Sequence, residues 1–130
     1  METIDLETTR GVELIDITGR VKESLGGIIS GVCIVFTPHT TTGIIVNENE
    51  DGLKGDILDL LNELVPIRRG YRHDRIDDNA HAHLKSLLLG PSVAIPVENG
   101  ELILGTWQRI FFVELDGPRR RKVYVKMIKG

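Results

Sequence analysis

The sequence has little of several features that mark specialised classes of protein. Its 130 residues include one cysteine, and aromatic residues make up only 5% of the chain. A single cysteine cannot form a disulfide within the chain, and the position of Cys33 in the apolar run from Val32 to Phe36 predicts a buried, unreactive thiol. With so few aromatic residues, a hydrophobic core must consist mainly of Ile, Leu and Val.

Neither an excess of basic residues nor a long hydrophobic segment is present. The net charge is −3, which argues against a broad nucleic-acid-binding surface. No apolar run has the length of a membrane span, and the acidic, alternating segment Met1–Glu7 does not resemble a signal peptide. We therefore expect a single cytoplasmic domain over residues 1–130 that binds neither nucleic acid nor membrane.

The spacing of hydrophobic residues predicts many strands and few helices. Alternating or β-branched segments predict strands at residues 3–8, 12–17, 31–36, 42–46, 92–97, 101–106, 108–116 and 122–129. Apolar residues at three- and four-residue spacing predict a helix over residues 53–64, and a short helix is expected over residues 18–25. Asn79 is expected to cap another helix that runs to Leu89. This order of elements indicates an α+β fold with largely antiparallel sheets and two or three helices.

A first polar cluster follows the predicted strand 31–36. His39 lies where the chain turns, with Thr40 beside it. An imidazole can move a proton or bind a metal near neutral pH, and a threonine hydroxyl can hydrogen-bond a phosphate. Asn47 follows the next strand, and Asp51 lies near the start of the long helix. A polar turn followed by a helix cap explains the same residues equally well, so this cluster alone does not decide between the two interpretations.

A second cluster is rich in histidine. His73 lies in a charged loop over residues 66–78, and His81 and His83 lie on the following helix. Positions i and i+2 of a helix point to different faces, so His81 and His83 cannot easily share a metal ion, and at most one of them is expected to be functional. Arg72 and Lys85 are candidates for binding an anion. Ordinary solvation of a loop and a helix is the alternative for these charged residues.

Two further segments carry weaker signals. Trp107 is the only tryptophan, and a lone tryptophan belongs more often to a core or an interface than to a ligand site. The amide of its neighbour Gln108 could hold a polar group of a ligand. The basic run Arg119–Lys122 follows a Gly-Pro turn, where the ordinary interpretation is an exposed hairpin tip, with phosphate binding as the alternative.

Three segments together resemble the YjbQ-like family. They are the segment 39–51, which begins His-Thr-Thr-Thr-Gly and ends Asn-Glu-Asn-Glu-Asp; the segment 71–90, with its Tyr-Arg-His and Ala-His-Leu-Lys-Ser motifs; and the segment 95–108, which ends Leu-Gly-Thr-Trp-Gln. Their order and spacing fit along essentially the whole chain. The resemblance implies a β-sandwich-type α+β fold that assembles as a homotrimer.

The resemblance also implies a chemistry. Some members of the family have a secondary thiamine-phosphate synthase activity, which joins a hydroxymethylpyrimidine diphosphate to a thiazole phosphate and releases pyrophosphate. The functional residues of the family fall on the following positions of this chain: His39, His73, His83, Asn47 and Asp51. The three histidines are the implied catalytic residues, and together with Asp51 they are the implied ligands of a divalent metal, Mg²⁺ or Zn²⁺. His81 lies outside the family pattern.

The expected function is a transferase reaction on a small phosphorylated molecule at a metal-assisted histidine site. Arg72 and Lys85 are expected to stabilise the negative charge of the leaving pyrophosphate, and Thr40, Asn47 and Gln108 to bind the substrate. Two alternatives stay open. One is a non-catalytic protein that binds a metal or a phosphorylated metabolite, and the other is a structural homotrimer whose histidines lie at a subunit boundary.

Overall fold

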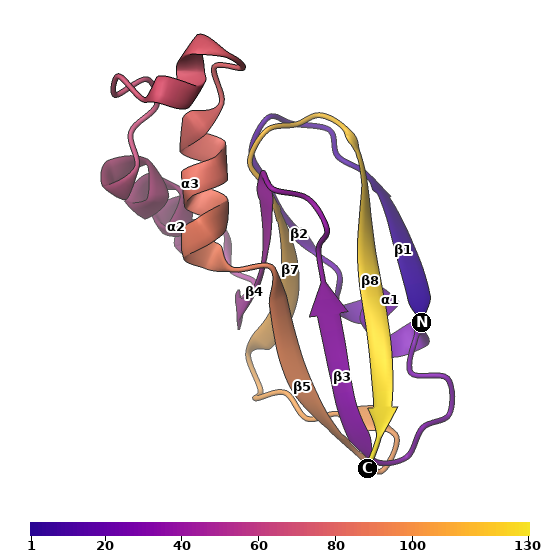
Figure 1. The fold of residues 1–130 in the computed structure, drawn as a ribbon. Coiled ribbons are helices and arrows are strands. Elements are labelled where there is room, and N and C mark those ends of the chain that lie inside the picture. The colour runs from indigo at the N-terminus through magenta and orange to yellow at the C-terminus, as the bar shows by residue number, and fades with distance from the viewer.

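Two antiparallel sheets, with helices beside one of them, make up the computed structural model, which describes residues 1–130 (Figure 1). The larger sheet has five strands in the order β1-β8-β3-β5-β6, and the smaller has three in the order β2-β7-β4. The strands are β1 (Glu2–Glu7), β2 (Glu13–Asp16), β3 (Gly31–Phe36), β4 (Thr42–Glu48), β5 (Ser92–Glu98), β6 (Glu101–Leu102), β7 (Gln108–Glu114) and β8 (Arg120–Lys129). The helices are α1 (Thr18–Glu23), α2 (Asp51–Leu64) and α3 (Ala80–Leu89), with a 3₁₀ turn at Arg72–Arg75.

The main hydrophobic core lies between the two sheets. Alternate residues of each strand point into it, as Cys33 and Val35 of β3 and Val123 of β8 do from the larger sheet. Ile44 and Phe112 meet them from the smaller sheet. The predicted α+β fold, with largely antiparallel, sandwich-like sheets and three helices, is confirmed.

Strand β7 is buried on both faces. Ile110 and Phe112 point into the core between the sheets, whereas Phe111 and Val113 pack with Ala82 of α3. Because both faces are covered, every residue from 110 to 115 is buried. Glu114, the one charged residue of this stretch, is therefore buried in the interior.

Helix α3 packs closely against β4 (Figure 1). A Cβ atom added at Gly43 would lie 2.7 Å from the Cβ of Leu89, so glycine permits this approach. The hydroxyl of Ser86 also donates to the backbone carbonyl of Thr42 at 2.5 Å. These contacts hold α3 next to the β3–β4 connection and bring its histidines toward His39.

The helix N-termini are capped by acidic side chains. Glu50 precedes α2 and accepts hydrogen bonds from the backbone amides of Gly52 and Leu53, which explains why α2 begins at Asp51, before the predicted start. Asn79 does not cap α3 with its side chain, contrary to the prediction, because Asp74 Oδ1 accepts the hydrogen bond from the backbone N–H of Ala80 at 2.9 Å. None of the helices has the length and apolar character needed to cross a membrane.

Candidate functional site

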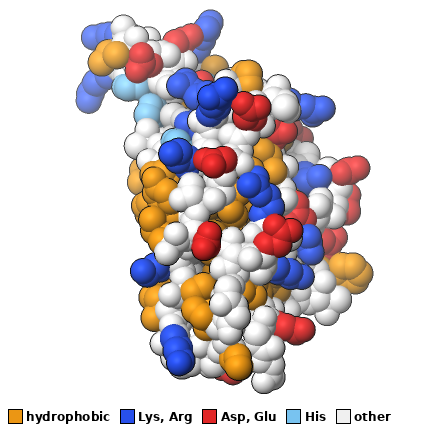
Figure 2. All heavy atoms as spheres, turned by 90° about the vertical axis from the view of Figure 1, so that its right-hand side faces the viewer, with side chains coloured by type: hydrophobic (Ala, Val, Ile, Leu, Met, Phe, Trp, Pro, Cys, Tyr) orange, Lys and Arg blue, Asp and Glu red, His pale blue; other side chains and the backbone are white.

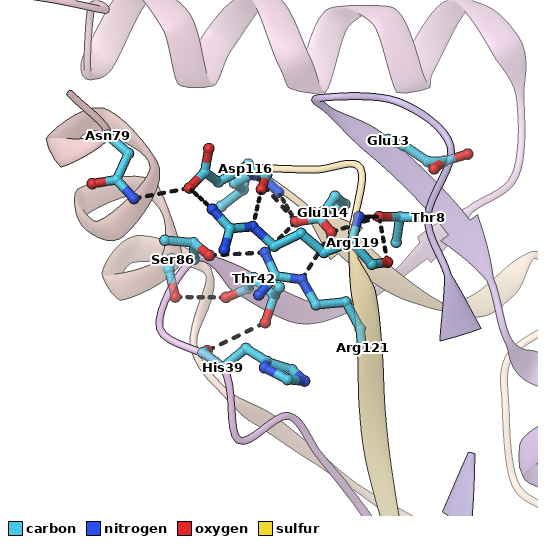
Figure 3. Close-up of polar contacts among 12 residues, drawn as sticks. Thr8, Glu13, His39, Thr42, Asn79, Ser86, Glu114, Asp116, Arg119 and Arg121 are labelled. Carbon is cyan, nitrogen blue, oxygen red and sulfur yellow. Dashed lines mark hydrogen bonds and ion pairs between the residues drawn. The ribbon is translucent and has the colours of Figure 1, made fainter. Parts of the chain in front are cut away.

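The connection between β3 and β4 carries His39 (Figure 3). The hydroxyls of Thr37 and Thr42 hold this connection through a 2.7 Å hydrogen bond. Nε2 of His39 accepts a hydrogen bond from the backbone N–H of Lys122 at 2.9 Å. Because a backbone amide only donates, Nε2 is unprotonated and the ring proton lies on Nδ1. His39 is therefore a neutral imidazole that keeps one N–H donor.

The surroundings of His39 favour the same neutral form. Burial lowers the pKa of the imidazole, and the neighbouring Arg121 guanidinium lowers this pKa further. Protonation of Nε2 would also break the hydrogen bond from Lys122. His39 is thus suited to donate a hydrogen bond through Nδ1 and unsuited to act as a cation.

A buried ion pair between Arg121 and Glu114 lies in the same region (Figure 3). Nε and Nη2 of Arg121 donate to the two carboxylate oxygens at 2.8 and 2.6 Å, a bidentate geometry. Nη2 also donates to Thr41 Oγ1, and Thr8 Oγ1 donates to Glu114 at 2.8 Å. Burial alone would raise the pKa of Glu114, but hydrogen bonds from Arg121 and Thr8 outweigh it and lower the pKa. The carboxylate therefore stays charged in the interior.

A chain of hydrogen bonds joins the segment before α3 to the β7–β8 hairpin. Asn79 Nδ2 donates to Asp116 Oδ2 at 2.8 Å, and Arg119 Nη2 donates to the same oxygen at 2.9 Å. With its amide nitrogen on a carboxylate, Asn79 presents its oxygen to His73 Nε2 at 3.0 Å. Since that oxygen only accepts, His73 carries a proton on Nε2. The rings of His73 and His83 stand edge to face, with centroids 4.7 Å apart.

Several of these side chains line one polar cavity of about 500 Å³. This volume lies within the range of small-molecule sites, roughly 300–1,000 Å³. The residues that line the polar cavity are Pro38, His39, Thr40, Thr41, Asp77, Asn79, His83, Asp116, Arg119 and Arg121. Apart from the proline, all of them are polar or charged. Figure 2 shows histidine and Arg or Lys side chains gathered on the upper part of one face of the molecule, with hydrophobic side chains below them.

The structure brings several of the predicted site residues together. His39, Thr40 and His83 line the polar cavity. His73 and Arg72 line a neighbouring hollow, which His83 also borders. The three predicted histidines therefore lie in one region, although His39 belongs to a different segment of the chain from the other two.

Asn47, Asp51 and Gln108 lie elsewhere in the chain. Strand β4 leaves the cavity region at Thr42, and Asn47 follows five residues later. At about 3.3 Å per residue, this places Asn47 about 16 Å further along the strand. Gln108 pairs with Glu48 at the same distant end, and Asp51 begins α2 just beyond it. Within one chain these three residues do not line the polar cavity.

Lys85 also differs from its predicted place, because its side chain points toward α2. It is only 3% exposed, and its Nζ donates to Asn62 Oδ1 at 2.5 Å. Lys85 and Asn62 border a small space with Leu58 and Leu61 of α2. Burial lowers the pKa of the Lys85 amine. Lys85 therefore contributes to the packing of the helices and does not reach an anion in the polar cavity.

The predicted metal ligands do not form one metal site in this chain. No three His, Cys, Asp or Glu side chains are grouped so that they could hold an ion. Coordination through Nδ1 of His39 would require its proton to move to Nε2, which would break the hydrogen bond from Lys122. Asp51 lies apart from the histidines and pairs with Lys54 at 3.4 Å. The predicted set of His39, His73, His83 and Asp51 is thus not assembled, and a tetrahedral Zn²⁺ site does not fit.

Comparisons with known proteins agree on one family. A family model described as UPF0047 protein YjbQ-like matches residues 2–130. The chain belongs to this family. A UPF0047 protein of Archaeoglobus fulgidus is 54% identical to it over 125 residues, which cover 96% of this chain and 98% of that protein. UPF0047 protein YugU of Bacillus subtilis is 46% identical, with 98% of each chain covered.

The fold of the YjbQ-like chain is also shared with a solved structure. The crystal structure of a YbjQ-like protein of unknown function from Sulfolobus solfataricus matches it with a TM-score of 0.97 and 44% sequence identity. The match covers 99% of this chain and 96% of that one. The two-sheet arrangement described above is therefore shared with that protein.

The buried ion pair of this YjbQ-like chain was not among the predicted site residues, although the sequence contains a signal for it. Arg121 alternates with Val123 and Val125 along β8, and all three are buried. Glu114 interrupts the apolar run Ile110–Leu115. A charged residue in phase with core positions predicts a buried, paired charge.

The basic run Arg119–Lys122 is only in part the exposed hairpin tip that the sequence suggested. Arg120 points outward, with a side chain that is 90% exposed. Arg121 points inward and is 6% exposed. The interpretation as a purely exposed tip is therefore wrong for Arg121, because strand alternation turns neighbouring residues to opposite faces of the sheet.

Proposed function

We propose that this YjbQ-like protein is a transferase that binds a small phosphorylated molecule in the polar cavity and releases pyrophosphate, as in thiamine-phosphate synthesis. The observation that carries the proposal is that His39, His83 and Arg119 line one cavity from three separate parts of the chain. A leaving pyrophosphate needs several fixed hydrogen-bond donors to stabilise its growing charge. The polar cavity supplies them.

Several N–H donors at the cavity have no partner in the protein. Arg121 uses Nε and Nη2, so both N–H groups of Nη1 remain. Arg119 uses Nε for the Asp116 carbonyl and one N–H of Nη2 for the Asp116 carboxylate. His39 adds its Nδ1–H. Because these side chains are already held by their other hydrogen bonds, they can meet an anion with little rearrangement.

The proposed reaction needs a stabilised leaving group more than it needs a base. A thiazole nitrogen attacks the methylene carbon of the pyrimidine diphosphate with its lone pair. The C–N bond forms while the C–O bond breaks, and pyrophosphate leaves with the bonding electrons. The nucleophile loses no proton in this step. A neutral, donating His39 and the arginine N–H groups therefore match what the reaction requires.

In the proposed reaction a divalent ion would bind together with the diphosphate. Mg²⁺ binds mainly to oxygen, through one or two carboxylates together with phosphate groups and water. Asp77 and Asp116 are the carboxylates that line the polar cavity, so they are the residues that would hold Mg²⁺. The ion would neutralise part of the charge on the leaving group. No three His, Cys, Asp or Glu side chains of this chain are grouped so that they could hold Zn²⁺.

We further propose that the protein acts in the cytoplasm as a homotrimer. The outer face of the larger sheet exposes hydrophobic side chains, since Val32 pairs with Ile128 there and both are partly exposed. Neighbouring exposed apolar residues mark surfaces that bind other proteins, and the family resemblance sets the number of copies at three. Light scattering should give a mass close to three times 14.5 kDa. A monomeric mass would contradict the assembly.

Purified protein, both thiamine precursors and Mg²⁺ test the transferase directly, with the product followed by chromatography. His83→Ala should lower the rate, because His83 is one of the three residues lining the cavity on which the proposal rests. His81→Ala is the matched control, because His81 lies on the same helix but does not line the polar cavity, and it should keep the rate within about twofold. No product from the unmodified protein, or an undiminished rate in His83→Ala, would refute the proposal.

Binding of a phosphorylated metabolite without turnover is a second candidate. It is favoured by the pairing of the cavity's arginines with carboxylates, Arg121 with Glu114 and Arg119 with Asp116. Such pairs make a rigid receptor. A large thermal shift with a phosphorylated metabolite, together with no product from the precursors, would support this candidate over the transferase.

A further inference from the structure

A second hollow adjoins the polar cavity and differs from it in chemistry. Its volume is about 410 Å³, also within the range of roughly 300–1,000 Å³ for small-molecule sites. It shares four lining residues with the polar cavity: Pro38, His39, Thr40 and His83. The rest of its wall consists of Phe36, Thr37, Ser86, Leu87 and Pro91. We call this space the apolar hollow.

The wall of the apolar hollow offers a ligand mostly carbon. Its hydroxyl groups from Thr37 and Ser86 are both engaged with Thr42, through hydrogen bonds of 2.7 and 2.5 Å. They therefore have little capacity left for a ligand. Leu87 is 77% exposed and Phe36 is 40% exposed. What remains is hydrophobic surface that water now covers.

The two spaces meet at His39 and His83, so one small molecule can occupy both. The polar cavity presents N–H donors, and the apolar hollow is lined by Leu87 and by the rings of Phe36, Pro38 and Pro91. Rigid rings lose little conformational entropy when a ligand packs against them. A flat ring complements such a wall better than a flexible chain, which would have to be ordered on binding.

We propose that the ligand of this site is a phosphate ester whose anionic group lies in the polar cavity and whose flat, uncharged ring lies in the apolar hollow, with Leu87 as a specificity-determining residue. The proposal rests on the anion site of the proposed function, and it adds where the ring of the ligand lies and which residue selects that ring. The ring and the phosphate must be separated by a short link, because the two spaces share the same two histidines.

The expected preference follows from the area that a ring can bury. At about 25 cal/mol per Å², a ring that removes roughly 60 Å² of apolar surface from water tightens binding about tenfold. Phenyl phosphate and methyl phosphate carry the same anion and differ in the ring. We expect phenyl phosphate to bind about tenfold more tightly in isothermal titration calorimetry with the intact protein.

The Leu87→Ser variant tests the position of the ring. The preference for phenyl phosphate should fall to about threefold or less, because part of the apolar wall is gone, while the affinity for methyl phosphate should not change. Leu88→Ser is the matched control: Leu88 is the next residue of α3 and is 58% exposed, but it does not line the hollow. This variant should keep the full preference. Both positions are exposed, so neither change should prevent folding.

Two outcomes would overturn this inference. Equal affinities for the two esters, or no binding of either, would mean that the hollow does not select a ring. An unchanged preference in Leu87→Ser would place the ring elsewhere. The proposed transferase fails in a different way: a clear ring preference with no product from the thiamine precursors would refute only the reaction, and product without a ring preference would refute only the ring site.

Discussion

Arg121→Met should destabilise the protein strongly, because it leaves a charged partner buried. Methionine retains much of the apolar stem of Arg121 but removes both hydrogen bonds from the guanidinium to Glu114. Glu114 is fully buried, and it would keep only the Thr8 hydroxyl and two backbone amides as donors. Breaking a buried ion pair on one side costs about 3–5 kcal/mol. Since three donors remain, we expect the lower end of this range, about 3 kcal/mol.

The stability that Arg121→Met loses should also depend on pH, and the structure determines the direction of this dependence. The pKa of Glu114 in the folded protein lies below its ordinary value, so its contribution to stability is present above that ordinary value and is lost as the pH falls through the lowered pKa. Without Arg121, burial should raise the pKa of Glu114, and acidification should then relieve the variant of a buried charge. The difference in stability between the two proteins should therefore narrow from pH 7 to pH 4.

Urea unfolding followed by far-UV circular dichroism can measure both effects. Trp107 is 69% exposed and is a poor fluorescence reporter of unfolding. Arg120→Met is the control, because this neighbouring arginine makes a solvent-exposed ion pair with Glu7 at 3.3 Å, and such pairs contribute little to stability. A loss in Arg121→Met no larger than the loss in Arg120→Met, or a gap that does not narrow on acidification, would refute the reasoning.

Three further predictions concern groups outside the polar cavity. Lys85→Met should raise the free energy of unfolding at pH 7 by about 1–2 kcal/mol, since burial lowers the pKa of this amine and no carboxylate compensates its charge; a decrease in urea unfolding experiments would contradict this. Burial alone would raise the pKa of Asp16, but hydrogen bonds from Arg109 and Thr18 lower it to about 2. The free energy of unfolding should therefore fall by about 2 kcal/mol as the pH drops from about 4 through 2. The Asp16→Asn variant should not show this decrease. Cys33 is fully buried, and burial raises its pKa to about 11. A thiol reagent at pH 8 should therefore label Cys33 only in denaturant, and fast labelling of the folded protein would contradict this prediction.

The sequence predicts the strands and helices well where the signal is a local period. The strand expected at residues 31–36 is β3 itself, and the helix expected at 53–64 is α2, which begins two residues earlier. The strand expected at 101–106 ends at Leu102. There the backbone N–H of Gly105 donates to the side chain of Gln108 at 2.7 Å, which turns the segment away from the sheet. A contact of this kind leaves no periodic signal in the sequence.

The site is predicted in part, because its residues come from motifs but its geometry comes from the sheet. Motif positions identified His39 and His83, which the packing of α3 on β4 brings to one cavity. The same motif includes Asn47, yet β4 carries it to the far end of the strand. Asp116 joins the site only because the β7–β8 turn brings it to Asn79. Sequence spacing cannot show which end of a strand faces a ligand.

The charges of the polar cavity suggest how it would select an anion. Two arginines and two aspartates line it, and His39 is held neutral. The arginine charges are thus largely compensated inside the protein, by Glu114 and Asp116. The binding of an anion would therefore be stabilised little by net positive charge and mainly by N–H groups that are fixed in direction. The bidentate pair with Glu114 leaves Nη1 of Arg121 only one orientation. The buried Glu114 therefore fixes the orientation of the Arg121 guanidinium at the site. Binding would then depend on the shape of the ligand's anionic group as well as on its charge.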